Sequence, residues 1–284
     1  MKFIVDYAIL RTALQLCAGV VEKKASSAVP SLMNVRLWAE GERLTLSATD
    51  LDVTAVCTIP AIIATGGGCT VEAAALLDIA KSAPDALTIV LNDANMRLTV
   101  TTGRASYTLP CMPIDSSPTL PDMGESGGLE FSASEFLPML RTVAYAIPFE
   151  NSKGMSLCGA YVKVQKTVVD VCATGGYQLA LMSLPGRFGQ ELSLLLPAKL
   201  VRSSEKLSVS ADATTVRLGW TDNHAAVTLG PVSIIGRRED VRYPNYNAMV
   251  PDDQSDVSFL AKTETLRATL GRVSPFTREQ TSAV

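Results

Sequence analysis

The chain has 284 residues, of which 47% are hydrophobic and 19% are charged, and its formal net charge is -3. Roughly 150 residues per domain is usual, so the length predicts about two domains, and the composition excludes intrinsic disorder. With a single histidine, His224, the sequence argues against a histidine-based catalytic triad and against a multi-histidine zinc site.

The N-terminal residues predict a short strand followed by an amphipathic helix. Residues 3–5 are strand-like, and residues 8–18 place apolar side chains at helical spacing. Gly19 marks the expected end of the helix. Asp6 interrupts the apolar N-terminus, and no apolar run reaches the length of a membrane span. We therefore expect a cytoplasmic protein that does not enter a membrane.

The next segment predicts strands around a second helix. Residues 43–50 alternate as a half-buried strand does. Residues 65–68 (TGGG) lack the Lys-Ser/Thr pair of a phosphate-binding loop, so we expect a flexible loop between a strand and a helix. Residues 71–82 predict that helix, and residues 87–100 predict a hairpin with its turn near 92–95.

The same order of elements then recurs. Phe131 and Phe259 follow Phe3 at equal spacing, and each opens a strand-like start followed by a predicted helix. Further counterparts in the second repeat are a strand over 168–175, a helix over 197–207 and a hairpin over 207–229. Strands dominate, and two helices per repeat would cover one face of a sheet. The fold class is therefore α+β rather than alternating α/β.

Two proline-rich stretches predict the domain boundaries. The first runs from Pro110 to Pro121 and ends at Gly127-Gly128, and the second covers residues 244–254. We expect one domain over residues 1–124 and a second over 128–250. Residues 255–284 would form only the incomplete start of a third domain.

Three motifs carry a resemblance to a known family. Residues 48–52 (ATDLD), 173–180 (ATGGYQLA) and 242–246 (RYPNY) resemble motifs of the bacterial sliding clamp, the beta subunit of DNA polymerase III. The resemblance implies tandem clamp domains, each with antiparallel sheets outside and two helices inside, in a homo-oligomeric ring around double-stranded DNA. It implies a non-catalytic processivity factor of DNA replication, with no cofactor and no metal, that binds DNA polymerase subunits and the clamp loader through short peptides.

The resemblance also implies a DNA-contacting surface. Basic side chains outnumber acidic ones on the predicted helices, and phosphate attraction needs no sequence-specific contact. From charge alone, the same residues would be ordinary solvated helix faces. The expected DNA-binding residues are Arg11, Lys23, Lys24, Lys81, Arg141, Asn151, Lys199 and Arg202.

A peptide pocket is the second implied site. Such a pocket needs an apolar groove with a few positioned polar groups. Without the resemblance, Leu157 and Leu179 would be assigned to the core. The expected wall residues are Leu157, Thr174, Gly176, Tyr177, Gln178, Leu179, Pro244, Ala248 and Met249.

Other chemically suggestive residues are interpreted as structural. Asp50 and Asp52 could share a metal, but the sequence offers no third ligand nearby, so we expect a turn at the end of a strand. His224 falls in an expected turn. The six cysteines, none in CxxC spacing, are expected to be reduced and buried.

The sequence leaves alternatives to the leading function. The chain could be a peptide-binding adaptor that no longer closes a ring, or an enzyme of unknown class. The incomplete third domain could reflect an interrupted reading frame, or two complete domains per chain could assemble as a trimer of six domains. Binding of a clamp-binding peptide without retention on circular DNA would favour the adaptor.

Overall fold

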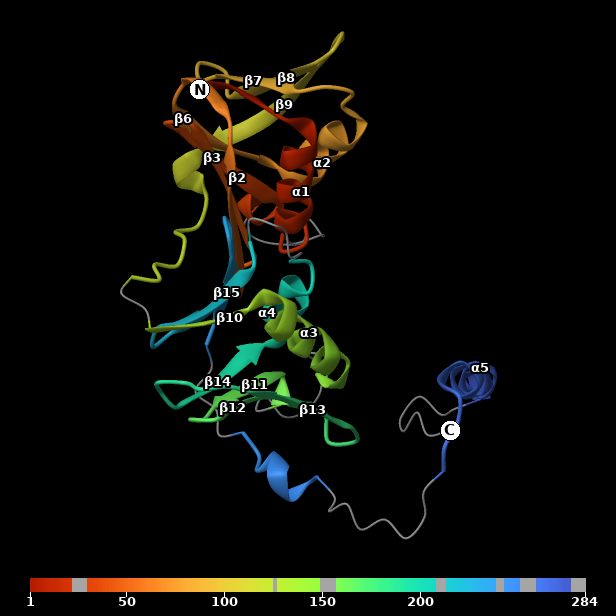
Figure 1. The fold of residues 1–284 in the computed structure, drawn as a ribbon. Helices are drawn as coiled ribbons and strands as arrows, with labels where there is room; N and C mark the ends of the chain where they lie inside the picture. The colour runs from red at the N-terminus through yellow and green to blue at the C-terminus, as the bar shows by residue number, and fades with distance from the viewer. Residues whose placement is uncertain are drawn as a thin grey trace.

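The computed structural model describes residues 1–21, 30–124, 127–148, 157–207, 213–238, 243–250 and 259–276. Two units of similar construction lie end to end, and a fifth helix stands apart from them (Figure 1). We call residues 1–124 the first unit and residues 127–250 the second unit. Both are built mainly from antiparallel strands with two helices each, which confirms the predicted α+β class.

The first unit opens with a capped helix. Asp6 accepts hydrogen bonds from the backbone N–H groups of Ala8 and Ile9, which have no partner within the helix. Its elements are β1 (Lys2–Val5), α1 (Tyr7–Cys17), β2 (Asn34–Glu40), β3 (Arg43–Thr49), β4 (Val53–Pro60), β5 (Ile62–Thr65), β6 (Gly67–Glu72), α2 (Ala73–Ser82), β7 (Leu87–Asn92), β8 (Arg97–Thr102) and β9 (Ala105–Pro113).

The second unit repeats this order with fewer strands. Its elements are β10 (Gly127–Ser132), α3 (Ala133–Val143), β11 (Gly159–Val164), β12 (Val168–Thr174), β13 (Leu179–Pro185), β14 (Leu192–Pro197), α4 (Ala198–Ser204), β15 (Thr215–Trp220), β16 (His224–Leu229) and β17 (Val232–Arg237). A 3-10 turn, η5 (Tyr246–Ala248), follows it, and α5 (Thr263–Val273) is the last helix.

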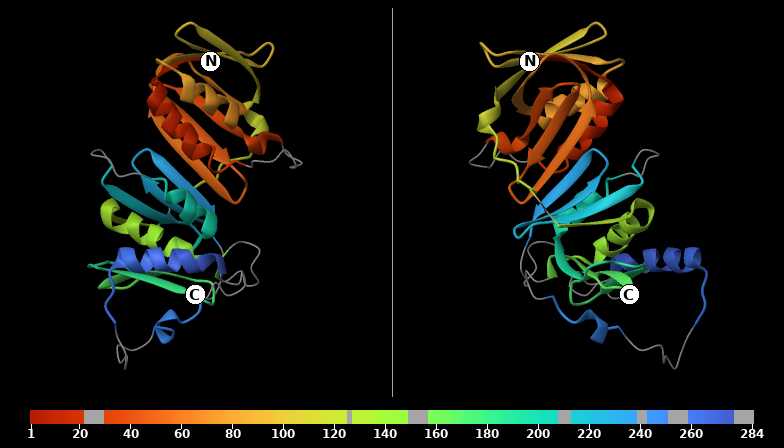
Figure 2. Two further views of the ribbon diagram at one scale, coloured as in Figure 1. Left: turned by 90° about the vertical axis from the view of Figure 1, so that its right-hand side faces the viewer. Right: turned by 60° about the vertical axis from the view of Figure 1, so that its left-hand side comes forward.

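Each unit packs its two helices against its sheets. In α1 the side chains of Leu10, Leu14 and Cys17 are fully buried, as the helical spacing predicts. α1 packs beside α2, and α3 beside α4. All four helices lie on the same side of the molecule, and the sheets form the other side (Figure 2). The helices therefore share one continuous surface.

The two units are joined by strand pairing. β17 of the second unit runs antiparallel to β4 of the first, from Val232 opposite Cys57 to Gly236 opposite Val53. Two further backbone hydrogen bonds extend this joint. The N–H of Arg237 donates to the carbonyl of Asp52 at 2.9 Å, and the N–H of Thr58 donates to the carbonyl of Pro231 at 3.0 Å. The result is one 13-stranded sheet that crosses the boundary between the units.

The expected flexible loop at residues 65–68 is wrong. β5 ends at Thr65 and β6 begins at Gly67, so Gly67 and Gly68 belong to a strand and Gly66 alone separates the two strands. Gly68 lies beneath the Trp38 and Ile114 side chains, and a Cβ there would come within 2.3 Å of Ile114 Cδ1. Glycine is thus required for close packing, not for flexibility. The predicted helix over 71–82 begins at Ala73, because residues 71–72 complete β6.

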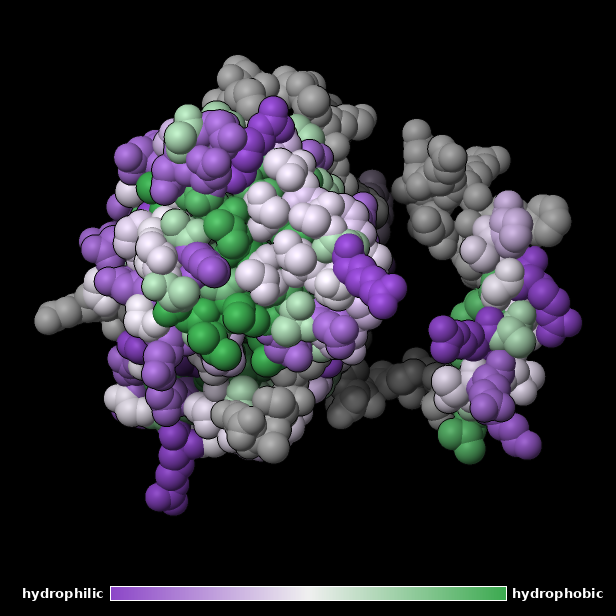
Figure 3. Space-filling view, turned by 90° about the horizontal axis from the view of Figure 1, so that it is seen from above, coloured by the Kyte–Doolittle hydropathy of each residue, from purple (hydrophilic) through white to green (hydrophobic). Residues whose placement is uncertain are grey.

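The expected strand at Phe259 is also wrong. Residues 259–262 are not in a strand, and α5 follows directly. A strand needs a neighbour for its backbone groups, and among the described residues none lies beside this segment. Phe259 and Leu260 are highly exposed, as is the whole of α5, which stands clear of the two units (Figure 3).

Several smaller expectations can be compared with the structure. Asp50 and Asp52 lie in the turn between β3 and β4, as expected. His224 is the first residue of β16, just after the turn in which it was expected. None of the six cysteines forms a disulfide, and all except Cys158 are buried. No helix in the described part of the chain is long and apolar enough to cross a membrane.

Candidate functional site

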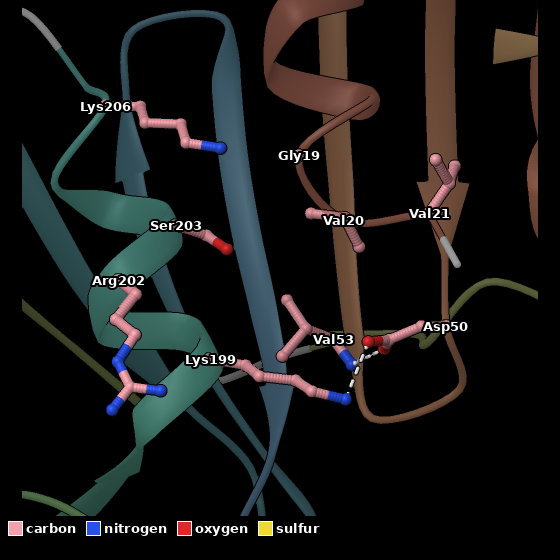
Figure 4. A pocket seen from close by; sticks show the side chains of 9 residues that line it. All are labelled: Gly19, Val20, Val21, Asp50, Val53, Lys199, Arg202, Ser203 and Lys206. Atoms are coloured by element: carbon pink, nitrogen blue, oxygen red, sulfur yellow. Dashed lines mark hydrogen bonds and ion pairs between the residues drawn. The ribbon is translucent and has the colours of Figure 1, made fainter. Parts of the chain in front are cut away.

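A cavity of about 380 Å³ lies where the helices of the two units meet (Figure 4). Its first-unit wall is the end of α1 and the β3–β4 turn, and its second-unit wall is one face of α4. The lining residues are Gly19, Val20, Val21, Asp50, Val53, Lys199, Arg202, Ser203 and Lys206. The sequence predicted the two basic residues Lys199 and Arg202 as DNA-binding, but not their convergence with Lys206.

Lys199 crosses from α4 to the first unit. Its Nζ lies 2.9 Å from Asp50 Oδ2 and 3.4 Å from Asp52 Oδ2. The Asp50 side chain is nearly buried, and its other oxygen accepts the N–H groups of Asp52 and Val53. The charge of Lys199 is therefore largely neutralised within the protein. We assign it to the joint between the units.

Lys206 and Arg202 are the other two basic residues that line the cavity. A Cβ on Gly19 would collide with Lys206 Nζ, so the lysine lies directly over the end of α1. A cation is favourable there because the last carbonyls of a helix carry partial negative charge. In Figure 4 the Arg202 side chain projects from α4, and the Lys206 side chain extends toward Gly19 from the turn that follows α4. They are the cations best placed to attract an anion at the junction.

The remaining predicted DNA contacts lie along the helices. The Arg11 guanidinium lies 6.0 Å from the Tyr7 ring centre, and Lys81 pairs with Asp78 at 2.9 Å. Arg141 donates hydrogen bonds to the carbonyls of Glu205 and Leu207, so it braces α3 against the end of α4. Lys23, Lys24 and Asn151 lie outside the described residues.

Five of the predicted peptide-pocket residues lie in or beside the β12–β13 turn, namely Thr174, Gly176, Tyr177, Gln178 and Leu179. Thr174 closes this turn, since its Oγ1 accepts the N–H of Gly176 at 3.1 Å and donates to the carbonyl of Gln178 at 2.7 Å. Gln178 Nε2 donates to the carbonyl of Tyr145. Tyr177, 88% exposed, projects from the turn.

An apolar cluster supports the same region on the outer face of the sheet. Buried Cys172 and Leu195 and buried Tyr243 and Tyr246 form its centre, with Leu157, Tyr161, Leu179 and Leu181 packed against them. Pro244 is half-buried beside it, whereas Ala248 and Met249 are exposed. The predicted wall residues Leu157 and Leu179 thus share a cluster with residues that follow β17.

The sequence did not single out the aromatic contacts that build this cluster. Tyr161 and Tyr243 stack with ring centres 4.6 Å apart, and Tyr246 donates its hydroxyl proton to Asp170 Oδ2 at 2.8 Å. Burial raises the pKa of the Tyr243 and Tyr246 hydroxyls and raises that of Cys172 to about 11. These groups stay neutral near pH 7. The alternation of side chains along a strand predicts that Asp170 and Cys172 share one face of β12, so the sequence offered a signal for this pair.

Comparisons with known proteins agree along the chain. Residues 1–121 match the family model described as "DNA polymerase III beta subunit, N-terminal domain". A beta sliding clamp of Caulobacter vibrioides is 28% identical over 292 residues, covering 100% of this chain and 77% of that protein. The Caulobacter crescentus DNA polymerase sliding clamp structure is 27% identical with a TM-score of 0.83, and it covers 98% of this chain and 76% of that one.

A sliding-clamp structure from Pseudomonas aeruginosa, bound to griselimycin, is 26% identical with a TM-score of 0.88 and covers 99% of this chain. The chain thus resembles bacterial sliding clamps along its length, and its first unit matches the N-terminal domain of that family. Members of this family are non-catalytic processivity factors. In the described part of the chain, no three His, Cys, Asp or Glu residues converge as metal ligands.

Proposed function

We propose that this sliding clamp holds duplex DNA along its helix-bearing surface and keeps a DNA polymerase close to its template. The observation that carries the proposal is the shared side of the four helices, with Arg202 and Lys206 at its centre (Figures 2 and 4). Contacts to phosphate need no base recognition, so the DNA can slide past them. A tethered polymerase gains effective concentration at the primer end without any catalytic group.

The charge requirement is testable through the salt dependence of DNA binding. Each lost phosphate contact lowers the slope of log K against log salt by about 0.9 for duplex DNA. We expect this loss for Arg202→Ala and for Lys206→Ala. The matched control is Lys166→Ala in the β11–β12 turn, which should leave the slope unchanged. Equal slopes for all three variants would refute the proposed DNA surface.

Topological retention separates the clamp from the adaptor. After loading by a clamp loader, a ring should remain on nicked circular DNA and should run off the same DNA once it is linearised. The adaptor predicts equal, weak binding to both forms. The comparisons favour the clamp over the adaptor.

We also propose that polymerase subunits and the clamp loader dock as short peptides at the apolar cluster beside the β12–β13 turn. Tyr177 and Met249 are exposed, and Leu157 and Leu179 pack against the centre of the cluster. Methionine suits a peptide surface because its side chain is flexible and polarisable.

A fluorescent peptide copied from the clamp-binding segment of a bacterial DNA polymerase tests this docking site. We expect Met249→Ala to weaken its binding about ten-fold, or about 1.4 kcal/mol. Met112→Ala, at an exposed methionine on β9, is the matched control and should bind as the unchanged protein does.

The domain division belongs to the same proposal. We place a first clamp domain at residues 1–124, a second at 128–250 and the start of a third at 255–284, in agreement with the repeated order of elements. Such a clamp would act in the cytoplasm, where the replicated DNA lies. Limited proteolysis should cut first between residues 117 and 124, which join the two units and lie in no helix or strand.

A further inference from the structure

Arg36 lies on the face of the large sheet that points away from the helices (Figure 2). Its neighbours along β2, Val35 and Leu37, are fully buried in the core, so the alternation of a strand turns Arg36 outward. Arg36 is nevertheless half-buried, and its Nε is shielded from solvent without a hydrogen-bond partner. In the described part of the chain, its guanidinium forms no ion pair with a carboxylate. A half-buried cation of this kind is unfavourable until an anion pairs with it.

The strands on either side of Arg36 place polar groups beside it. Ser47 of β3 and Thr70 of β6 lie directly opposite Arg36, and both are buried although they belong to the outer face. Thr70 Oγ1 accepts a hydrogen bond from Asn34 Nδ2 at 3.2 Å. Among the described residues, the Ser47 hydroxyl has no hydrogen-bond partner. Two neighbouring donors, a hydroxyl and a guanidinium, therefore lack an acceptor.

Apolar side chains border these donors. Trp38, two residues along β2, is 39% exposed, and Ile114 of the segment after β9 lies beside it over Gly68. Across β6, Met112 is 36% exposed. The surface around Arg36 thus combines an unpaired cation with partly exposed apolar groups. A peptide that carries one acidic and one apolar side chain would cover both.

The second unit covers the equivalent place with its own chain. Arg36 and Tyr161 are equivalent, because each lies opposite the residue two positions before the threonine that closes the next turn. In the second unit the Tyr243 ring, from the segment after β17, stacks on Tyr161. In the first unit the segment after β9 lies over Gly68, the next position along the sheet, rather than over Arg36. The position that the second unit fills from within is therefore left for a partner in the first.

We propose that the Arg36 surface binds an extended segment of a partner protein, with a Glu or Asp carboxylate on the Arg36 guanidinium and an apolar side chain two residues away over Trp38 and Ile114. An arginine fork holds a carboxylate through two charge-assisted hydrogen bonds, and the Ser47 hydroxyl can donate another. Side chains two residues apart in an extended segment are about 7 Å apart, which matches the spacing of Arg36 and Trp38 along β2.

The charges beyond this surface favour a single carboxylate over a polyanion. Glu40 accepts the Trp38 indole N–H at 3.0 Å, and Glu72 lies opposite Asn34 at the other end of β2. Strand alternation places both acids on the same face as Arg36. Repeated phosphates would meet these two carboxylates, whereas one carboxylate can reach the guanidinium between them. A nucleic acid is thus disfavoured on this face of the molecule.

The fluorescence of Trp38 tests the site in Trp220→Phe protein. The probe is acetyl-Ser-Glu-Thr-Leu-Ser-amide, whose only carboxylate is the glutamate, and its control peptide carries glutamine instead. We expect a saturable shift of the Trp38 emission with the first peptide and about ten-fold weaker binding of the second. Absence of a saturable shift, equal affinities of the two peptides, or an equal effect of acetate at the same concentration would overturn the proposal.

Substitutions then locate the carboxylate. Arg36→Gln should weaken binding of the glutamate peptide about ten-fold, and Arg36→Lys should keep part of the affinity, since it retains the charge but not the fork. The matched control is Arg97→Gln, at an exposed arginine on β8, which should bind as the unchanged protein does.

Two further measurements separate this site from other causes of lost binding. Because Arg36 has no hydrogen-bond partner to lose, urea denaturation of Arg36→Gln should show no loss of stability, so unfolding would not explain weaker binding. Met249→Ala, in the second unit, should bind the glutamate peptide as the unchanged protein does. Loss of binding in Met249→Ala but not in Arg36→Gln would place the peptide at the apolar cluster and overturn the proposal.

Discussion

The β3–β4 turn of the first unit and the β12–β13 turn of the second share one backbone but carry different chemistry. Thr49 and Thr174 close the two turns with equivalent hydrogen bonds to the backbone two and four residues on. The residue after next has a positive φ in both, +79° at Leu51 and +88° at Gly176. Repetition has preserved the geometry of the turn.

The residues beside these equivalent positions differ between the two units, and so do their contacts. In the first turn, Asp50 and Asp52 hold Lys199 and fix the joint. In the second turn, Gly175 and Tyr177 stand in their places, and Tyr177 projects beside the apolar cluster. The comparison teaches that one turn geometry can hold an ion pair between the units in one copy and can carry an exposed aromatic side chain, part of the proposed partner surface, in the other.

Alkaline unfolding should show the largest difference between the units. In the first unit, burial raises the pKa of Cys57 to about 11 and that of Cys69 to about 12, and it also raises that of Cys17. In the second unit, burial raises the pKa of Cys172 to about 11 and raises those of the Tyr243 and Tyr246 hydroxyls, which ordinarily titrate about one pH unit higher than a thiol. Above pH 9 the unfolded chain releases these protons while the folded chain retains them. Stability present below pH 9 is therefore lost toward pH 11, at about 1.4 kcal/mol per thiol and pH unit.

The two tryptophans make this measurable unit by unit. Trp38 lies in β2 and Trp220 in β15, and the chain has no other tryptophan. In Trp220→Phe protein, the fluorescence of Trp38 should report unfolding of the first unit at a lower pH than Trp220 reports in Trp38→Phe protein. If both tryptophans report unfolding at the same pH, the strand pairing between the units makes them unfold together despite their different buried thiols.

Removing the turn-closing hydroxyls should be the next largest effect. Thr49→Val loses the turn bonds and leaves the buried Thr54 hydroxyl without its acceptor, so we expect a loss of about 2–3 kcal/mol. Thr174→Val should cost about 1–2 kcal/mol, because Leu179 stands where Thr54 stands. Urea denaturation checks both values, and a larger loss in Thr174→Val would contradict the comparison.

Exchanging the positive-φ residues should have a smaller effect of opposite sign in the two turns. Gly176→Leu imposes a left-handed conformation on a side chain that disfavours it, which costs about 1–2 kcal/mol. Leu51→Gly relieves that strain but gives the unfolded chain more freedom, so we expect a gain below about 1 kcal/mol. Thermal unfolding measures both, and destabilisation by both would show that Leu51 is held by contacts.

Much of this architecture could be predicted from the sequence. Helical spacing located α1, α3 and α4 to within a few residues, and the motifs at 48–52 and 173–180 marked the equivalent turns. These features depend on local periodicity. The strand at Gly67–Glu72 was missed, because only the packing of Trp38 and Ile114 over Gly68 makes glycine favourable there. Such packing joins residues that are far apart in the sequence.

The candidate site shows the same limit. The sequence indicated Lys199 and Arg202 as cations on a helix, but it could not show that Asp50, 149 residues away, neutralises one of them. Likewise, the spacing of Tyr243 and Tyr246 gave no sign that Tyr161 stacks on one and Asp170 binds the other. These partners meet only after the units have folded.

Lys199→Ala should give the smallest change in stability. It tests whether Lys199 serves the ion pairs between the units or a contact to DNA phosphate. The Lys199 side chain is 38% exposed, so losing its ion pairs should cost less than about 1 kcal/mol. Because Asp50 and Asp52 already neutralise it, the salt slope of DNA binding should stay closer to that of the unchanged protein than in Lys206→Ala. A full loss of 0.9 in the slope would instead mean that DNA phosphate displaces the aspartates from Lys199. In that event the joint would open its ion pair whenever the clamp binds DNA, and Asp50→Asn would strengthen DNA binding.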